Sequence, residues 1–439
     1  MKNTVIIAEK PSVGADLGKI LGIAERTKNF IRLKNGDCIT WAYGHLFTQL
    51  HLKEYGPEWA KPWAQLDLPV FPEKFLNKIG YKKEEQVRII KKLLKDAHTV
   101  VLATDAGREG ELIGREILEH CGFRGTVKRF WTSSMTDKDI RKALAALLPG
   151  ETKEPLYQAA LVRQHADFMY GTNLTMQATI SADTGEMFSV GRVQTPTLSL
   201  IVKRDQEIEG FQAKVYYELE ADITTRNGHK LKMRHAPKEK EQITSKAEAV
   251  RRMELAKGCK APLEVEHTEG AEGPPQPYSQ PAMQADADRL FKFPAAKTLE
   301  LAQKLYEKKA ITYPRTDCEY LAEDQATEVP GVLENLERLF PTAVTLASTP
   351  APRIRKSVFD DSKLTDHHAI VPTAQPVPLE GDELKLFTLV AQRYLQILAP
   401  EATYNATKVS MDANGVPFVA SGRVYTNESW RDIKLLSTD

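Results

Sequence analysis

Residues 100–111 have the sequence Val-Val-Leu-Ala-Thr-Asp-Ala-Gly-Arg-Glu-Gly-Glu, and this stretch decides the fold class. The apolar run Val100 to Ala103 is typical of a buried strand, and the stretch from Gly107 to Leu118 continues at once as a helix. A strand, a polar turn and a helix in direct succession are typical of a parallel sheet with crossover connections. We therefore expect an α/β domain around this stretch.

The same order of elements occurs at the start of the chain. Val5 to Ala8 is a short apolar run typical of a strand, and a helix can begin at Pro11 and continue to Leu21. Residues 86–94 have apolar side chains on one helical face, directly before the strand at 100. These units predict that the first ~145 residues form one parallel-sheet domain.

The rest of the chain alternates between helical and β-rich stretches. Residues 214–266 and the chain after Pro400 are predicted to be β-rich, and the Gly- and Pro-rich stretch 270–277 is predicted to be a linker. A β-rich piece interrupted by a helical insertion is the most economical interpretation of residues 214–439. We expect helices at residues 156–180, within 186–208, and at 281–292, 297–309 and 383–398.

Composition limits the class of protein only broadly. The 439 residues are 42% hydrophobic and 27% charged, which is ordinary for a soluble protein. The net charge is only +1, so any nucleic-acid site would have to come from a local cluster of basic side chains. The four cysteines are scattered without a Cys-x-x-Cys pair, so structural zinc and disulfides are not expected and a reducing cytoplasm fits. No apolar run is long enough for a signal peptide or a membrane span, so we expect no membrane association.

Carboxylates follow both predicted strands. Glu9 comes directly after the first strand, and Asp105, Glu109 and Glu111 lie in and after the turn at the end of the second. Ligands of open α/β sheets bind at this edge, and converging carboxylates suit Mg²⁺, which needs only one or two protein ligands. The alternative is an exposed acidic turn at a helix N-terminus, where acidic side chains are favoured.

A nucleotide-binding loop is the obvious rival for phosphate chemistry. The stretch Gly14 to Lys19 superficially resembles such a loop, but its spacing is one residue short. Ile20 stands where the hydroxyl that binds Mg²⁺ belongs. We therefore expect no ATP binding there.

A tyrosine segment follows the predicted helix 297–309. Pro314 favours an extended conformation for Tyr313, and Arg315 then lies on the same side of the chain. A phenol beside a cation is a plausible nucleophile toward a phosphodiester, because the cation stabilises the phenolate. The alternative is a packed tyrosine near a helix end.

A histidine pair forms a third polar cluster at Asp366-His367-His368. Adjacent histidines do not share a helix face, so a metal pair is not expected. One histidine as a phosphate contact or proton donor is the functional interpretation, and a satisfied surface histidine is the alternative.

Taken in order, these segments resemble the type IA DNA topoisomerases, and topoisomerase III among them. One such motif could occur by chance, but the ordered set is highly specific. The matching segments are Ile7 to Ser12, Tyr43-Gly-His-Leu46, Ala103 to Ile113, Arg129-Phe-Trp-Thr-Ser133, Arg163 and Asp167, Ser189 to Leu198, Leu305 to Lys309, Ile311 to Asp317, and His367 to Pro372.

This resemblance implies a fold and a reaction. It implies a Toprim domain followed by a helical and β-rich toroidal core, and Tyr313 as the nucleophile that keeps the 5′ phosphate of a cut strand. Glu9 would be the general acid, and Lys10, Arg315 and His367 would hold the scissile phosphate. The metal ligands implied for Mg²⁺ are Glu9, Asp105 and Glu109.

The resemblance also implies the partner. Single-stranded or underwound DNA would be bound without ATP, by a protein that works on the nucleoid in the cytoplasm. The residues implied to contact the strand are Arg163, Ser189, Arg192, Gln194 and Thr316. The implied domains are a Toprim domain at 1–145, a helical domain at 146–212, a β-rich arch at 213–277, a helical domain with the tyrosine at 278–402, and the return of the arch at 403–439.

Two features depart from the family pattern. The acidic turn commonly has Asp-x-Asp, and here the second position is Gly107, which should weaken Mg²⁺ binding. The sequence ends at Asp439 without the Lys-Pro-Pro and Gly-Thr-x-Ala-Thr-Arg segments of family members. We expect either a fragment or truncated gene product, or a core whose remainder comes from another chain. A ring without that return should have exposed apolar surface and impaired strand passage. The alternatives are another Toprim enzyme, a primase or a nuclease, and a remnant that binds single-stranded DNA without cutting it.

Overall fold

The structure, a computed structural model, describes residues 3–132, 135–237, 242–364 and 367–436. It divides into two compact units, each built from separate parts of the chain. The first unit comprises Met1–Arg204, Tyr278–Asn335 and Phe359–Phe387, and the second comprises Asp205–Pro277, Leu336–Val358 and Thr388–Asp439.

A seven-stranded sheet forms the centre of the first unit, in the order β2-β3-β4-β1-β7-β8-β9. The inner strands β4, β1, β7 and β8 are parallel, whereas the edge pairs β2–β3, β3–β4 and β8–β9 are antiparallel. The strands are β1 (Asn3–Ala8), β2 (Ile23–Arg26), β3 (Phe30–Leu33), β4 (Cys38–Trp41), β7 (Ala97–Ala103), β8 (Thr126–Arg129) and β9 (Leu148–Pro149), and a separate pair is formed by β5 (Phe47–Gln49) and β6 (Asn77–Ile79).

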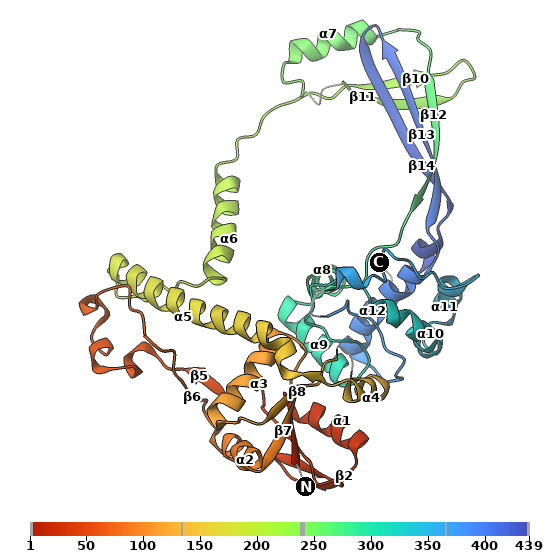
Figure 1. Cartoon of the computed structure of the whole chain (residues 1–439). Helices are drawn as coiled ribbons and strands as arrows, with labels where there is room; N and C mark the ends of the chain where they lie inside the picture. Colours follow the sequence, from red (N-terminus) through yellow and green to blue (C-terminus); the bar gives the residue numbers. More distant parts are fainter. Residues whose placement is uncertain (1–2, 133–134, 238–241, 365–366, 437–439) are drawn as a thin grey trace. The chain divides into compact units, whose positions relative to one another are not determined.

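Helices cover both faces of this sheet (Figure 1). The predicted strand and helix units are confirmed, since α1 (Pro11–Leu21) follows β1, and α2 (Glu84–Lys95) and α3 (Arg108–Cys121) flank β7. Alternate residues of β1 and β7, such as Val5 and Leu102, are buried in one cluster with residues of α2 and α3. The opposite face receives α1, which packs on β4 so closely that a Cβ at Gly14 would lie 2.8 Å from the Trp41 ring.

The remaining helices agree with the predicted ranges and add several that were not predicted. The predicted helices are α5 (Glu154–Ala182), α6 (Gln194–Glu209), α8 (Gln280–Phe291), α9 (Ala295–Glu307) and α12 (Gly381–Leu398). The additional helices are α4 (Asp137–Ala145), α7 (Lys246–Ala256), α10 (Val329–Glu337) and α11 (Pro341–Ser348). No helix within the described ranges has the length and apolar character needed to cross a bilayer.

The second unit contains a five-stranded antiparallel sheet in the order β10-β11-β14-β13-β12. Its strands are β10 (Glu220–Thr224), β11 (Lys230–His235), β12 (Glu264–Glu272), β13 (Ala402–Ala413) and β14 (Val416–Asn427). The β-rich prediction for 214–266 is wrong where α7 forms. The linker prediction is wrong for Gly270, which pairs with Tyr404 in the sheet and whose missing side chain makes room for that ring, 2.4 Å from where a Cβ would lie.

A glycine shapes the turn after β7. A Cβ at Gly110 would lie 1.9 Å from the carbonyl oxygen of Asp105, so the first turn of α3 can approach the end of the strand only without a side chain there. The hydroxyl of Thr104 also donates a 2.7 Å hydrogen bond to the carbonyl of Gly110. The turn is thereby folded tightly onto its own helix.

We expect the variant Gly110→Ala to be destabilised, although alanine favours a helix. The overlap with Asp105 should cost about 1–3 kcal/mol of unfolding free energy. The matched control is Gly171→Ala in α5, where the nearest atom would be 3.8 Å away and alanine should stabilise by about 0.5–1 kcal/mol. Chemical denaturation followed by circular dichroism measures both, and equal shifts in the two variants would contradict the close approach.

Candidate active site

Glu9 and Asp105 lie side by side at the carboxyl ends of adjacent parallel strands. Ala8 of β1 is paired in register with Ala103 of β7, which brings the residues after both strands to the same edge. The backbone N–H of Asp105 donates a 3.1 Å hydrogen bond to the Glu9 carboxylate, and Glu9 is only 9% exposed. The sheet therefore brings together two of the three predicted acidic residues.

The surroundings of Glu9 favour its protonated form. Burial raises the pKa of the Glu9 carboxyl above its usual value, and the charge of Asp105 raises it further. The N–H of Asp105 and the nearby cations Lys10 and Arg315 act in the opposite direction. A buried carboxyl with a raised pKa can hold a proton and donate it to a leaving group.

A buried ion pair holds the acidic turn from behind. Glu111 is fully buried and accepts hydrogen bonds from Arg129 and, at 3.0 Å, from Arg115. Arg129, itself 1% exposed, also donates to the carbonyl of Asp105 at 2.7 Å. The carboxylate of Glu111 is therefore engaged by Arg129 and Arg115.

The position of Tyr313 is fixed by the pairing of its own segment with the segment that follows His367. Thr312 donates its N–H to the carbonyl of Val371 and accepts the N–H of Val371 on its hydroxyl, both at 3.0 Å. Ile311 forms a bridge with Pro372 in the same pairing. The segments that carry Tyr313 and His367 are thus held together by hydrogen bonds to backbone groups.

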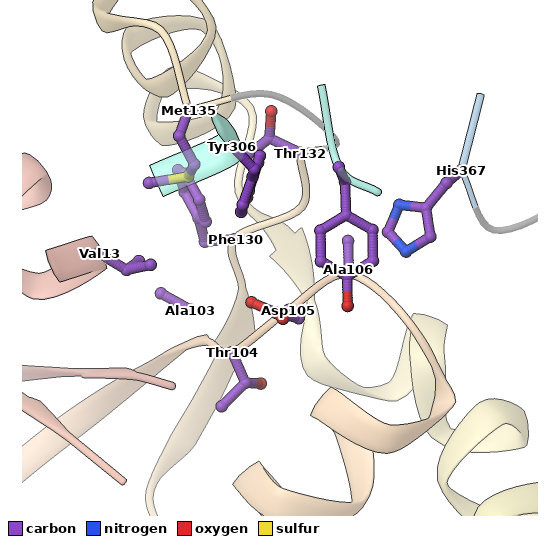
Figure 2. A pocket seen from close by; sticks show the side chains of 11 residues that line it. Val13, Ala103, Thr104, Asp105, Ala106, Phe130, Thr132, Met135, Tyr306 and His367 are labelled. Atoms are coloured by element: carbon purple, nitrogen blue, oxygen red, sulfur yellow. The ribbon is translucent and has the colours of Figure 1, made fainter. Parts of the chain in front are cut away.

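Tyr313 and His367 lie in contact in the pocket at the end of β7. Their ring centroids are 4.5 Å apart, and Tyr306 meets the Tyr313 ring edge-on at 5.4 Å. Asp105, His367 and Tyr306 surround this pocket together with Thr104, Phe130 and Thr132 (Figure 2). The predicted nucleophile therefore shares one pocket with Asp105 of the predicted acidic cluster.

The titration of both rings follows from their burial. Burial and the negative charge of Asp105 raise the pKa of Tyr313, whereas the guanidinium of Arg315 lowers it by donating a hydrogen bond to the phenol oxygen. Burial and the neighbouring His368 lower the pKa of His367 to about 4. His367 is consequently a neutral imidazole near neutral pH.

A wider groove lies on the other side of His367. It is lined by Arg108, Gln280, Pro281, Arg315, Thr316, Asp317 and His367. Thr316 is buried, with its hydroxyl accepting the N–H of Cys318 at 3.1 Å. Cations from both sides of the groove can face a phosphate backbone.

Glu109 points to a partner that sequence reasoning missed. His45 forms a 2.7 Å hydrogen bond with Glu109 and lies 3.7 Å from the carboxylate of Glu116. These two carboxylates raise the pKa of His45 to about 9, and His45 in turn lowers the pKa of Glu109. Metal ligation by Glu109 stays a prediction.

Four of the five predicted strand-binding residues gather around Asp167 on α5. Arg192 forms two hydrogen bonds with the Asp167 carboxylate, at 2.5 and 3.1 Å, and Arg163 lies 3.8 Å from it. Gln194 donates a 2.7 Å hydrogen bond to the hydroxyl of Ser189 in the same turn. Thr316, the fifth, lies in the groove beside His367 instead.

The donor set fits a weakly held Mg²⁺ rather than a closed metal cage. Among the residues that the structure describes, no three His, Cys, Asp or Glu side chains converge as a metal-binding group. Glu9 and Asp105 are hard oxygen donors close together, which suits an ion that keeps several waters and takes further ligands from phosphate. Asp366 lies outside the described residues.

The chain is similar to known proteins over almost its whole length. The Toprim domain model matches residues 4–135, and the DNA topoisomerase family model matches residues 151–439. The chain is 35% identical to DNA topoisomerase 3 of Bacillus subtilis over 99% of its own length and 60% of that relative, and 33% identical to DNA topoisomerase 3 of Vibrio cholerae over 97% and 70%. Its fold is similar to full-length topoisomerase I from Thermotoga maritima, with a TM-score of 0.69 at 22% identity over 99% of this chain and 68% of that one. The chain spans about 60% of the length of its Bacillus relatives.

We expect His45 to titrate near pH 9 in an NMR experiment, because Glu109 and Glu116 stabilise its charged form. Since the pKa is raised in the folded state, this contact stabilises the fold fully below the unfolded value of 6.5 and is lost as the pH rises through about 9. The variant Glu109→Gln should move the pKa toward 6.5, whereas Glu119→Gln, on the same helix, should not. A wild-type pKa near 6.5 would refute the contact.

Proposed function

Because the chain belongs to the type IA DNA topoisomerases and is topoisomerase III-like, we propose that it cuts and reseals one DNA strand through a bond between Tyr313 and the 5′ phosphate. The observation that carries this proposal is the pocket in which Tyr313 lies with Asp105 and against His367. Transesterification conserves the energy of the broken phosphodiester in the phosphotyrosine. Resealing therefore needs no ATP.

The proposed cleavage step is balanced in bonds and protons. The phenol oxygen of Tyr313 releases its proton to water and forms a bond to phosphorus, and the bond from phosphorus to the 3′ oxygen breaks. Glu9, whose pKa is raised by burial and by Asp105, donates a proton to that oxygen, which becomes a 3′ hydroxyl. Resealing is the same step in reverse.

Cations hold the scissile phosphate in this proposal. Arg315 already donates a hydrogen bond to the phenol, so it can stabilise both the phenolate and the charge that develops on the phosphate. Lys10 beside Glu9 and the neutral His367 beside Tyr313 would contact the phosphate from two other sides. Mg²⁺ held by Glu9 and Asp105 would supply further positive charge next to the phosphodiester.

The substrate we propose is single-stranded or underwound DNA. Arg163, Ser189, Arg192 and Gln194 form one polar cluster on and after α5, where they can follow a phosphate backbone. Between cleavage and resealing, one end stays on Tyr313 and the other end stays beside Glu9. Passage of a second strand requires these two sides of the pocket to separate, which gives relaxation and decatenation as the outcomes.

We expect Tyr313→Phe to abolish the covalent adduct, because the attacking oxygen is removed. Labelled single-stranded DNA is incubated with the protein and Mg²⁺, SDS is added, and label linked to protein through a 5′ phosphate is measured by gel. Tyr306→Phe is the matched control, since it removes a phenol oxygen from the same pocket and should keep the adduct. Label on the Tyr313→Phe protein would refute the proposal, and binding without an adduct in the wild type would favour a DNA-binding remnant.

We expect Gly107→Asp to bind Mg²⁺ more tightly, because it adds a carboxylate to the acidic turn. The backbone at Gly107 is extended, and the nearest atom to a Cβ there would be Nε2 of His367 at 3.6 Å, an ordinary contact. Calorimetric titration of the DNA-free protein should show an affinity increase of about tenfold. Gly107→Asn, without the charge, is the control, and an equal affinity in both variants would contradict the expectation.

A further inference from the structure

Lys309 joins the tyrosine segment to the N-terminal sheet. Its ammonium lies 2.9 Å from a carboxylate oxygen of Asp16 on α1 and 3.3 Å from one of Asp137 at the start of α4. Asp137 is also held by Lys19 at 3.1 Å. The four side chains form a network that connects the end of α9 with two helices beside the acidic turn.

Lys309 is held by its backbone as well as by its side chain. Its φ of +65° is in the left-handed region, which a lysine rarely occupies. The hydroxyl of Thr373 donates a hydrogen bond to its carbonyl, and its side chain is only 16% exposed. A partly buried cation between two carboxylates is screened less by salt than a surface pair.

The neighbouring lysine provides the contrast. Lys308 pairs with Glu383 of α12, within the part of the chain that carries the tyrosine. Lys309, by contrast, contacts the part that carries Glu9 and Asp105. Only three residues lie between Lys309 and Tyr313, and one of them, Thr312, is fixed by its backbone pairing with Val371. Lys309 and Tyr313 therefore lie at the two ends of one short segment that is hydrogen-bonded to residues 371–373.

We propose that Lys309 is a positioning residue that sets the approach of Tyr313 to Glu9 and Asp105 through its ion pairs with Asp16 and Asp137. This inference rests on the proposed cleavage by Tyr313. Because Lys309 lines neither the pocket nor the groove described above, its loss slows the chemical step without weakening DNA binding. The same ion pairs must break when the two sides of the pocket separate, so their strength also controls how often the cut strand opens.

The test compares Lys309→Asn, Lys309→Arg and Lys308→Asn in the full chain. Asparagine tolerates the left-handed backbone, so Lys309→Asn removes the charge without adding strain. We expect the rate of adduct formation to fall about tenfold or more in Lys309→Asn, with an unchanged Kd for the oligonucleotide. Lys309→Arg, which keeps the charge, should restore the rate, and Lys308→Asn should stay within about twofold of the wild type.

The two carboxylates give an independent check on the same contact. Asp137→Asn should slow adduct formation in the same direction, and the double variant with Lys309→Asn should be less than additive. A loss of DNA affinity that matches the loss of rate would overturn the proposal and make Lys309 a phosphate contact. Equal losses in Lys308→Asn and Lys309→Asn would overturn it as well.

A measurement without DNA separates this inference from the proposed function. Hydrogen exchange of the free protein should become faster in α4 and in residues 310–316 of Lys309→Asn, but not of Lys308→Asn. If the wild type forms no adduct, the proposed function fails while the exchange data still test the contact. Unchanged exchange in Lys309→Asn would show that Lys309 does not hold the two parts together.

Discussion

The buried ion pair between Glu111 and Arg129 is the interaction on which the candidate site depends. Burying two charges is costly unless each finds further partners, and Arg129 uses its remaining donors on the carbonyls of Leu102 and Asp105. Those carbonyls belong to the end of β7 and the turn that follows it. The hydrogen bonds that offset the desolvation of Arg129 therefore also fix the backbone conformation of the acidic turn. Gly110 permits the close approach of α3 to Asp105 that this conformation requires.

The second constraint is the backbone pairing between residues 310–313 and 369–373. It aligns Tyr313 with His367 without any contact from the acidic turn, so each side of the pocket is ordered by its own hydrogen bonds. In the proposed reaction, each side of the pocket holds one end of the cut strand. Because each side has its own hydrogen bonds, the two sides could separate without either one unfolding. Lys309 joins the two sides through side chains only. Side-chain ion pairs can break and re-form without unfolding either side, whereas a shared backbone ladder could not.

Local patterns predicted the parallel strands, most helices and the pairing of Glu9 with Asp105, since apolar runs and strand ends depend on neighbouring residues alone. The resemblance to a family was needed to predict that Tyr313 lies at the same sheet edge, because Asp105 and Glu9 are about 200 residues away or more in the sequence. The partners of these charged residues were missed, since nothing local shows that the buried Arg129 reaches Glu111 or that His45 reaches Glu109. Gly270 was misread as a linker residue because the Tyr404 ring that it accommodates belongs to a distant strand.

The pKa directions of Tyr313 and Glu9 share two physical causes, burial and the charge of Asp105. Without DNA, burial and the charge of Asp105 keep the Tyr313 phenol protonated, and Glu9 is also favoured in its protonated form. Positive charge brought next to Asp105 opposes the repulsion that disfavours the phenolate. Added cations also favour ionisation of Glu9, so the same change that prepares the nucleophile prepares the acid to give up its proton. Because both shifts share the charge of Asp105 as a cause, cations bound next to Asp105 would favour the proposed attack and proton donation together, and would offset the negative charge of the phosphate.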